Sequence, residues 1–153
     1  MNNGRFTVLW ESPAPSQQSW RAPWVEILRS RVRLCFDYEG PNGGYRCGAL
    51  QFSNVRAFKF IDAFACRTRR SEAYEKLIEI ANSDWVGEIQ TTVLGSNARL
   101  GAVHHYQVYF DDVGLYDIAA ESWGHIALID PPPVNGLLDA VHPYPPDPSI
   151  AGS

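Results

Sequence analysis

The chain has 153 residues, a formal net charge of −4, 45% hydrophobic residues and five tryptophans. This length corresponds to one domain that can bury a core without metal or disulfides. No apolar run approaches the roughly 18 residues of a transmembrane helix. The start MNNGRFTVLWESP also lacks the basic and apolar segments of a secretory signal, so we expect neither feature.

Cysteine usage predicts a reducing compartment. Cys35, Cys47 and Cys66 form no C-x-x-C pair, and their odd number argues against a disulfide framework or a zinc ribbon. Cys35 and Cys47 lie in strand-like segments, where a free cysteine usually behaves as a small buried hydrophobe. We therefore expect a cytoplasmic protein with no cofactor and no metal.

Charge is unevenly distributed along the chain. Residues 1–99 hold all 13 basic residues and ten acidic ones, whereas residues 100–153 hold seven acidic residues and no Lys or Arg. The acidic part argues against nucleic-acid binding, which needs Lys and Arg at the phosphates. It would suit a basic protein partner. The alternative is that these acids only keep a surface solvated.

Alternation of apolar and polar residues predicts the strands of the first half. The turn sequence Gly40-Pro41-Asn42-Gly43-Gly44 between two such segments predicts a hairpin. A turn or bulge at Ser53-Asn54 separates its second strand from another. The expected strands are 5–11, 32–39, 45–52 and 54–60, and a polar, basic loop follows at 62–72.

The stretch 73–90 allows two interpretations. Five apolar residues between Tyr74 and Trp85 fit one helical stripe. Alternatively, 76–81 forms a strand and Ser83 caps a short helix that continues through Ile89. The β-branched Ile78 and the helix-start signal around Ser83 favour the strand followed by the helix.

The segment 103–123 predicts a second hairpin, because apolar and polar residues alternate on both sides of Asp111-Asp112-Val113-Gly114. A three-residue loop with Gly114 at the αL bulge position keeps the apolar residues on one face. The expected cross-strand pairs are Val108 with Ile118, Tyr106 with Ala120, His105 with Glu121, and Tyr109 with Asp117. His104 falls on the apolar face, where we expect a hydrogen-bonded histidine at the edge of the core.

The polar face of this hairpin is the candidate functional site. It comprises His105, Tyr109, Asp117, Glu121 and Trp123, with Gln107 and His125 on the same parity. Exposed aromatics beside acids suit a protein contact, unless a second sheet or the tail covers them. A histidine that faces a glutamate, together with His125, would suit acid–base chemistry or a metal site with two histidines and one carboxylate. His125 lies too far along the strand for this set, so we favour the protein contact.

Three segments carry a resemblance to a group of known proteins. LQFSNVRAFKF (50–60), IEIANSDW (78–85) and HYQVYFDDVGLYDIAAESW (105–123) resemble phrases in small uncharacterised bacterial proteins. The resemblance covers about residues 48–123 and implies a bacterial, cytoplasmic origin. The group has no activity to carry over to this chain. Some proteins of this kind are regarded as immunity or accessory proteins of toxin systems, a role that would fit the acidic C-terminal third.

Together these patterns predict one α+β domain over residues 1–129, with a mainly antiparallel sheet and one short helix. Seven of the 11 prolines follow Asp130, so residues 130–153 should form an extended or disordered tail. The expected core residues are Val8, Trp10, Leu34, Phe36, Leu50, Phe52, Phe58, Trp85, Val108, Phe110 and Ile118.

The favoured function is a non-enzymatic module that binds a basic protein through the acidic hairpin face. Two alternatives remain. One is a small-molecule or metal-dependent activity at His105, Glu121 and His125. The other is a structural homodimer that pairs through an exposed sheet edge.

Overall fold

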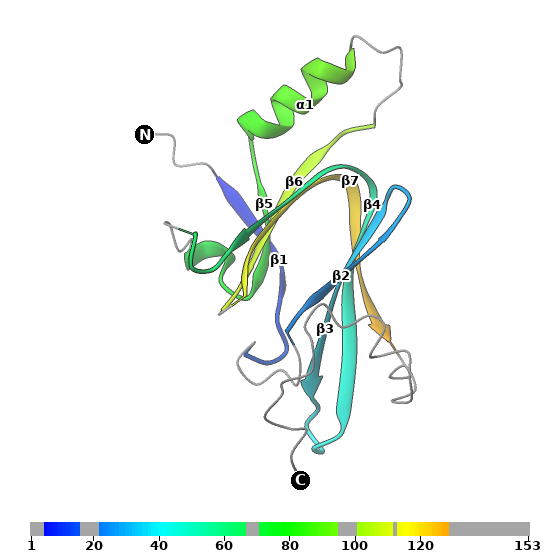
Figure 1. Cartoon of the computed structure of the whole chain (residues 1–153), viewed down its shortest axis with the longest axis vertical. Coiled ribbons are helices and arrows are strands. Elements are labelled where there is room, and N and C mark those ends of the chain that lie inside the picture. Colours follow the sequence, from blue (N-terminus) through cyan, green and yellow to red (C-terminus); the bar gives the residue numbers. More distant parts are fainter. Residues whose placement is uncertain (1–4, 16–21, 67–70, 95–100, 112, 129–153) are drawn as a thin grey trace, which may run out of the picture.

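The computed structural model describes residues 5–15, 22–66, 71–94, 101–111 and 113–128. Within these ranges it has one antiparallel seven-stranded sheet, one α helix and a short 3-10 helix, so the α+β architecture is confirmed (Figure 1). The proline-rich tail predicted for 130–153 lies outside the described residues. The strands are β1 (Phe6–Glu11), β2 (Trp24–Leu28), β3 (Arg31–Glu39), β4 (Tyr45–Asp62), β5 (Lys76–Ile80), β6 (His104–Phe110) and β7 (Gly114–Leu128).

The sheet curls strongly around its own concave face. Its strand order is β1-β5-β6-β7-β4-β3-β2, which places β1 and β3 far apart within the sheet. Even so, the ring of Trp10 on β1 lies 5.1 Å from the ring of Phe36 on β3. Figure 1 shows how the long strands β4 and β7 arch over together and bring these distant strands near each other. The curvature therefore lets one sheet enclose most of its own core.

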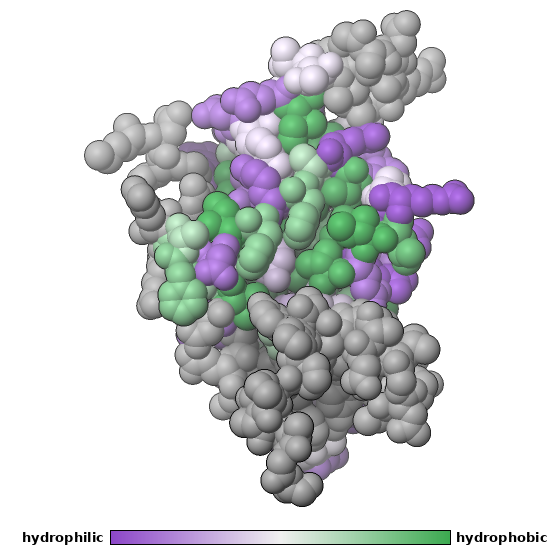
Figure 2. All heavy atoms as spheres, in the orientation of Figure 1, coloured by the Kyte–Doolittle hydropathy of each residue, from purple (hydrophilic) through white to green (hydrophobic). Residues whose placement is uncertain are grey.

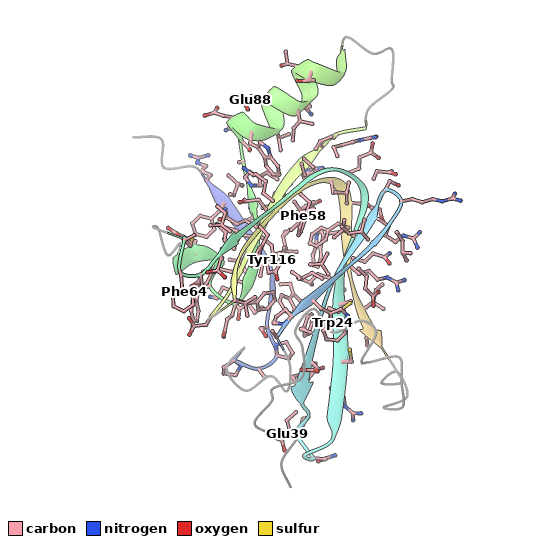
Figure 3. The ribbon with its side chains drawn as sticks, in the orientation of Figure 1. Trp24, Glu39, Phe58, Phe64, Glu88 and Tyr116 are labelled. Atoms are coloured by element: carbon pink, nitrogen blue, oxygen red, sulfur yellow. The ribbon has the colours of Figure 1, made fainter. Side chains whose placement is uncertain are left out.

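The core fills the concave face with large side chains. It contains Leu34, Phe36, Leu50, Phe52, Leu77, Tyr106, Val108, Phe110, Tyr116, Ile118 and Ala120. Trp10, Phe58 and Trp123 are partly buried against it, and Figure 3 shows Phe58 and Tyr116 in the middle of the curled sheet. Burying a side chain such as Phe52 or Leu50 stabilises the fold by about 1.5–3 kcal/mol. The core prediction is thus confirmed for most of the residues that it named.

Val8 is one exception, because it lies on the opposite, convex face. It pairs with Ile78 and is 42% exposed. The register of β1 against β5 shifts between Val8 and Trp10, as at a β-bulge. Such an extra residue turns the side chains that follow it to the other face. The regular alternation assumed for residues 5–11 therefore placed Trp10 correctly and Val8 wrongly.

Helix α1 (Asp84–Leu94) covers part of the convex face (Figure 1). Val86 packs with Val103 and Ala119 in a buried cluster, and Trp85 and Ile89 flank it. The structure confirms the strand-then-helix interpretation of 73–90, since β5 precedes the helix directly. Trp85 thus packs in this separate cluster and not in the concave core.

The expected segments 45–52 and 54–60 are halves of one bent strand, β4. Asn54 adopts φ 52°, and the register of β4 against β7 shifts between Val55 and Ala57. The turn or bulge predicted at Ser53-Asn54 is therefore a bend within a continuous strand. The short edge strand β2, which pairs with β3, lies outside the strands expected from the sequence.

The second hairpin forms, but its predicted register is wrong by two residues. Tyr106 pairs with Ile118, Gln107 with Asp117, and Phe110 with Gly114. The three-residue loop therefore spans 111–113, one residue earlier than expected, and Gly114 is the first residue of β7 with φ 150°. A shift of two residues leaves the side chains of β6 and of β7 up to Ala120 on their expected faces, so the apolar and polar sorting survives there while each partner changes.

Candidate functional site

The polar face of the β6–β7 hairpin lies on the convex side and is largely buried. His105, Tyr109 and Asp117 are 9%, 2% and 5% exposed. Their neighbours in the sheet are Ile78 and Ile80 of β5, and helix α1 packs over one end. The expectation that this face meets solvent is therefore wrong for these three residues.

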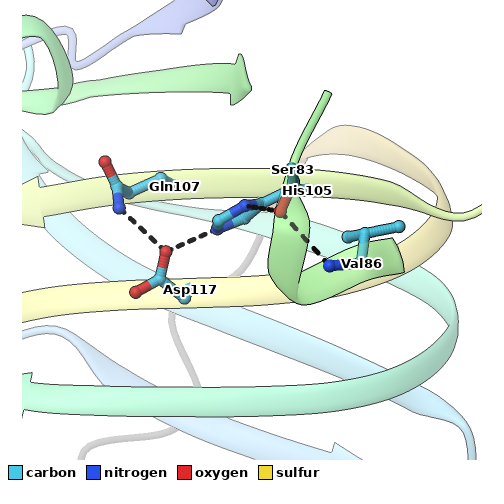
Figure 4. Close-up of polar contacts among 5 residues, drawn as sticks. All are labelled: Ser83, Val86, His105, Gln107 and Asp117. Carbon is cyan, nitrogen blue, oxygen red and sulfur yellow. Dashed lines mark hydrogen bonds and ion pairs between the residues drawn. The ribbon is translucent and has the colours of Figure 1, made fainter. Parts of the chain in front are cut away.

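A continuous chain of hydrogen bonds links helix α1 to the hairpin (Figure 4). Nδ1 of His105 lies 2.7 Å from Oγ of Ser83, and Nε2 of His105 lies 2.6 Å from Oδ1 of Asp117. An ionised carboxylate can only accept, so Nε2 carries the proton and donates it to Asp117. In the neutral ring Nδ1 is then an acceptor, and the Ser83 hydroxyl donates to it. We call Ser83, His105, Gln107 and Asp117 the buried polar chain.

Gln107 fixes the carboxylate from the neighbouring strand. It stands directly opposite Asp117, and its amide nitrogen donates to Oδ1 at 2.8 Å. Figure 4 shows the amide oxygen pointing away from Asp117. That oxygen is buried and accepts no hydrogen bond among the described residues. Rotating the amide would bring two oxygens together, so the carboxylate sets the orientation of Gln107 at the expense of one unsatisfied acceptor.

Asp117 stays ionised in this setting. Burial alone would raise its pKa, but hydrogen bonds from His105 and Gln107 and electrostatic attraction by His105 and Lys59 outweigh burial, so the pKa is lowered. Lys59 stands directly opposite Asp117 on β4, with its Nζ 4.0 Å from the centre of the Trp85 ring. The carboxylate is thus held as an anion that orients His105.

Ser83 reaches His105 because it is the N-cap of helix α1. Its Oγ accepts the backbone N–H of Val86 at 3.2 Å, and its carbonyl accepts the N–H of Gly87 at 3.0 Å. The edge of the Trp85 ring meets His105 at a centroid distance of 5.0 Å. Sequence reasoning identified the cap but missed its contact with His105, which lies 22 residues further along the chain. Only the docking of α1 on the sheet brings the two together.

Glu121 does not face His105 and takes part in a different set of contacts. Its carboxylate accepts hydrogen bonds from Asn54 at 2.7 Å, from Arg56 at 3.1 Å and from the backbone N–H of Gly101 at 3.0 Å. The hydrogen bonds from Asn54 and Arg56 lower its pKa. Glu121 therefore joins the bend of β4 to the segment before β6.

Trp123 and His125 lie on the concave side, contrary to the expected parity. Trp123 pairs with Phe52 and packs on the core, and the His125 ring stacks on Phe36 at 6.2 Å. The bend shared by β4 and β7 separates them from the face that holds His105. The structure therefore does not bring together the proposed set of His105, Glu121 and His125. The described residues contain no group of three His, Cys, Asp or Glu side chains placed to hold a metal.

His104 is a hydrogen-bonded histidine at the edge of the core, as predicted. Its Nδ1 pairs with the carboxylate of Glu79 on β5, and its ring stacks on Tyr106. Burial, together with the negative charge of Glu79, raises the pKa of Tyr106 to about 12. Cys35 and Cys47 are buried, also as expected.

Exposed apolar side chains lie on both faces of the sheet where β4 ends beside the turn of the β6–β7 hairpin, since Phe60 and Ile61 are consecutive residues of one strand. Phe64 is 97% exposed, and Phe60, Ile61 and Tyr74 are 37–46% exposed. Phe60 pairs with Tyr116, Ile61 with Leu115, and Tyr74 with Tyr109, so all of them border the same turn. We call Phe60, Ile61, Phe64 and Tyr74 the aromatic end. Sequence reasoning missed it, because it treated 62–72 as a loop without asking which side chains that loop exposes.

Comparison with family models, with curated proteins and with solved structures finds no match to this chain. No helix in the described part of the chain is both long and apolar enough to cross a membrane. The function therefore has to be inferred from the surface and the buried polar chain themselves.

Proposed function

We propose that this chain is a protein-binding module that contacts its partner through the aromatic end. The observation that carries the proposal is Phe64, a large aromatic side chain with 97% of its surface in solvent. Figure 3 shows it at the margin of the molecule, away from the core around Tyr116. Aromatic side chains on a rigid support are the residues that most often dominate binding energy at interfaces.

Hydrogen bonds and a ring contact hold the backbone beneath this surface. The N–H of Phe64 donates to Oδ1 of Asp62 at 2.9 Å, which holds the turn, and the N–H of Ala63 donates to the carbonyl of Val113 at 3.1 Å. Phe60 packs against Tyr116 with ring centroids 4.8 Å apart. Such anchoring lowers the entropy cost of presenting the aromatic side chains to a partner.

The surface combines apolar area with negative charge. Figure 2 shows, in the orientation of Figure 1, apolar side chains intermixed with hydrophilic ones below helix α1. At the aromatic end, Asp62 and Glu72 are exposed, and Asp111 accepts a hydrogen bond from the Tyr74 hydroxyl at 3.0 Å. Exposed apolar patches on the order of a few hundred Å² often mark interaction sites. Carboxylates at the rim favour a basic protein partner.

The proposed contact surface differs from the polar hairpin face that the sequence predicted. Asp117 is enclosed by His105 and Gln107, and Glu121 is bonded to Asn54 and Arg56. Both carboxylates are therefore already engaged in hydrogen bonds within the chain. We retain the basic partner and the bacterial, cytoplasmic, immunity-like role as part of the proposal, and the exposed acids Asp62 and Glu72 support the basic partner.

The test compares Phe64→Ala with Ile27→Ala, a matched control on strand β2 whose side chain is 64% exposed. Immobilised wild type and Ile27→Ala should retain the same stoichiometric basic protein from a bacterial lysate, and Phe64→Ala should lose it. The complex should also weaken with salt, because exposed charges are screened. Equal retention by all three proteins would refute the proposal.

The molar mass measured by light scattering distinguishes binding of a different protein from self-association of this chain. A wild-type dimer that becomes a monomer in Phe64→Ala would show that the aromatic end binds a second copy of the chain. That result would replace the proposed partner with the homodimer. A monomeric wild type with Phe64-dependent retention of a basic protein would support the proposal.

A further inference from the structure

We propose that Ser83 is an activated nucleophile that His105 and Asp117 prepare for attack on a small carboxylic ester. The geometry points to this because a hydroxyl, an imidazole and a carboxylate stand in series at 2.7 and 2.6 Å. Three separate elements bring them together: the turn before α1, strand β6 and strand β7. This series of groups is the one that turns a weak serine nucleophile into a reactive one.

Each bond in the series has the direction that base catalysis requires. Asp117 accepts from Nε2 of His105, which leaves the lone pair of Nδ1 aimed at the Ser83 hydroxyl. Gln107 holds the carboxylate from the neighbouring strand at 2.8 Å. His105 therefore cannot turn away without breaking a charge-assisted hydrogen bond inside the protein.

The start of helix α1 adds stabilisation for negative charge on the serine oxygen. The N–H of Val86 points at Oγ from 3.2 Å, within the first turn of an 11-residue helix. The first N–H groups of a helix and its dipole favour an anion at this position. Ser83 is half-buried between the exposed residues Asn82 and Asp84, so this turn borders solvent.

Capping alone does not account for this arrangement. A cap needs only that Oγ accept a backbone N–H, and its own proton can go to water. Here the proton is directed at an imidazole that is 9% exposed, which is oriented in turn by a carboxylate that is 5% exposed. Placing an ionised group inside the sheet has a large desolvation cost that a helix cap does not require.

The reaction balances with water as the only co-reactant. Oγ of Ser83 attacks the ester carbonyl carbon while its proton passes to Nδ1 of His105, and Asp117 stabilises the resulting imidazolium. The imidazolium then protonates the departing alkoxide, which leaves as an alcohol and leaves an acyl group on Ser83. Nδ1 next takes a proton from water, whose oxygen attacks the acyl carbon. The carboxylic acid departs as the proton returns from His105 to Oγ.

The experiment uses the full chain and an alkyl fluorophosphonate, a reagent that modifies activated serines, with p-nitrophenyl acetate as the ester. Ser83→Asn is the main variant, because asparagine caps helices as well as serine does but offers no nucleophile. His105→Gln removes the base, and Ser122→Ala is a control on an exposed serine. Circular dichroism and thermal unfolding test whether each variant folds.

The expected result is one phosphonate per wild-type chain on the peptide that contains Ser83, with the same yield in Ser122→Ala. Folded Ser83→Asn should gain no label, and His105→Gln should react at least about 100-fold more slowly, the lower end of base-catalytic effects. The rate of p-nitrophenyl acetate hydrolysis should also fall in Ser83→Asn and in His105→Gln. Folded wild type that stays unlabelled, or label that persists in Ser83→Asn, would overturn the proposal.

Discussion

Removing the carboxylate of Asp117 should lower the free energy of unfolding substantially. In Asp117→Ala, the donors on His105 and Gln107 lose the oxygen that lies 2.6 and 2.8 Å from them. Each buried donor left unsatisfied costs about 1–3 kcal/mol. With two such donors, we expect the free energy of unfolding to fall by about 2–6 kcal/mol, which lowers Tm by about 4–24 °C at this chain length.

Urea unfolding at pH 7, followed by tryptophan fluorescence, measures this loss. Asp117→Asn keeps an acceptor oxygen without the charge, so its loss should fall between those of wild type and Asp117→Ala. Glu121→Ala is the matched control, since it removes the other described acid of β7 from a more exposed position. If Asp117→Ala lost no more stability than Glu121→Ala, the buried polar chain would not hold the hairpin and the helix together as argued.

Two further predictions concern acid stability and glycine positions. The pKa of Asp117 is lower in the folded chain than its ordinary value of 3.8, so its stabilisation is complete above about pH 4 and disappears as the pH falls through the folded value. The stability advantage of wild type over Asp117→Asn in urea should therefore shrink below about pH 4. Gly48→Ala would place a Cβ 2.9 Å from the Phe36 ring and should lower the free energy of unfolding by about 1–3 kcal/mol. Gly87→Ala meets nothing within 4 Å inside helix α1 and should raise it by about 0.5–1 kcal/mol, so equal effects of the two substitutions would contradict this account.

Alternation and turn chemistry were sufficient to predict most elements of the sheet. The glycine-rich turn before Tyr45 joins β3 to β4, and the Ser83 signal does begin helix α1. These features are local, because a strand's alternation and a helix cap depend on residues within one or two turns of the chain. The same holds for His104, whose place among apolar neighbours was enough to predict a hydrogen-bonded histidine at the core edge.

The errors concentrate where the strands are irregular. A register shift after Val8 exchanges the two faces of β1, and the bend at Asn54 places Trp123 on the core side of β7. In the hairpin, a loop displaced by one residue moves every cross-strand partner by two, so Ala119 stands opposite His105 in place of Glu121. Asp117, two residues further along and opposite Gln107, is the carboxylate that His105 contacts. Alternation survives such changes, so the pattern alone could not reveal them.

The candidate sites required tertiary structure for a different reason. Ser83 and His105 are far apart along the chain and meet only because α1 packs on Val103 and Ala119. Phe64 could have attracted attention as an aromatic residue in a polar loop, yet sequence alone does not say whether such a ring folds back onto the core. The structure therefore contributed the partner of His105 and the exposure of Phe64, and both proposals depend on these two facts.

The two proposed sites lie toward opposite ends of the β6–β7 hairpin, which makes them separable. His105 is the second residue of β6 and Phe110 is its last, beside the aromatic end, a span of roughly 16 Å at the usual rise of a strand. Substitutions this far apart that share no partner act independently. Phe64→Ala should therefore abolish partner retention while Ser83 keeps its full rate of phosphonate labelling, and Ser83→Asn should do the reverse. If either substitution removed both properties, the two sites would be coupled through the sheet, and neither assignment would stand as an independent function.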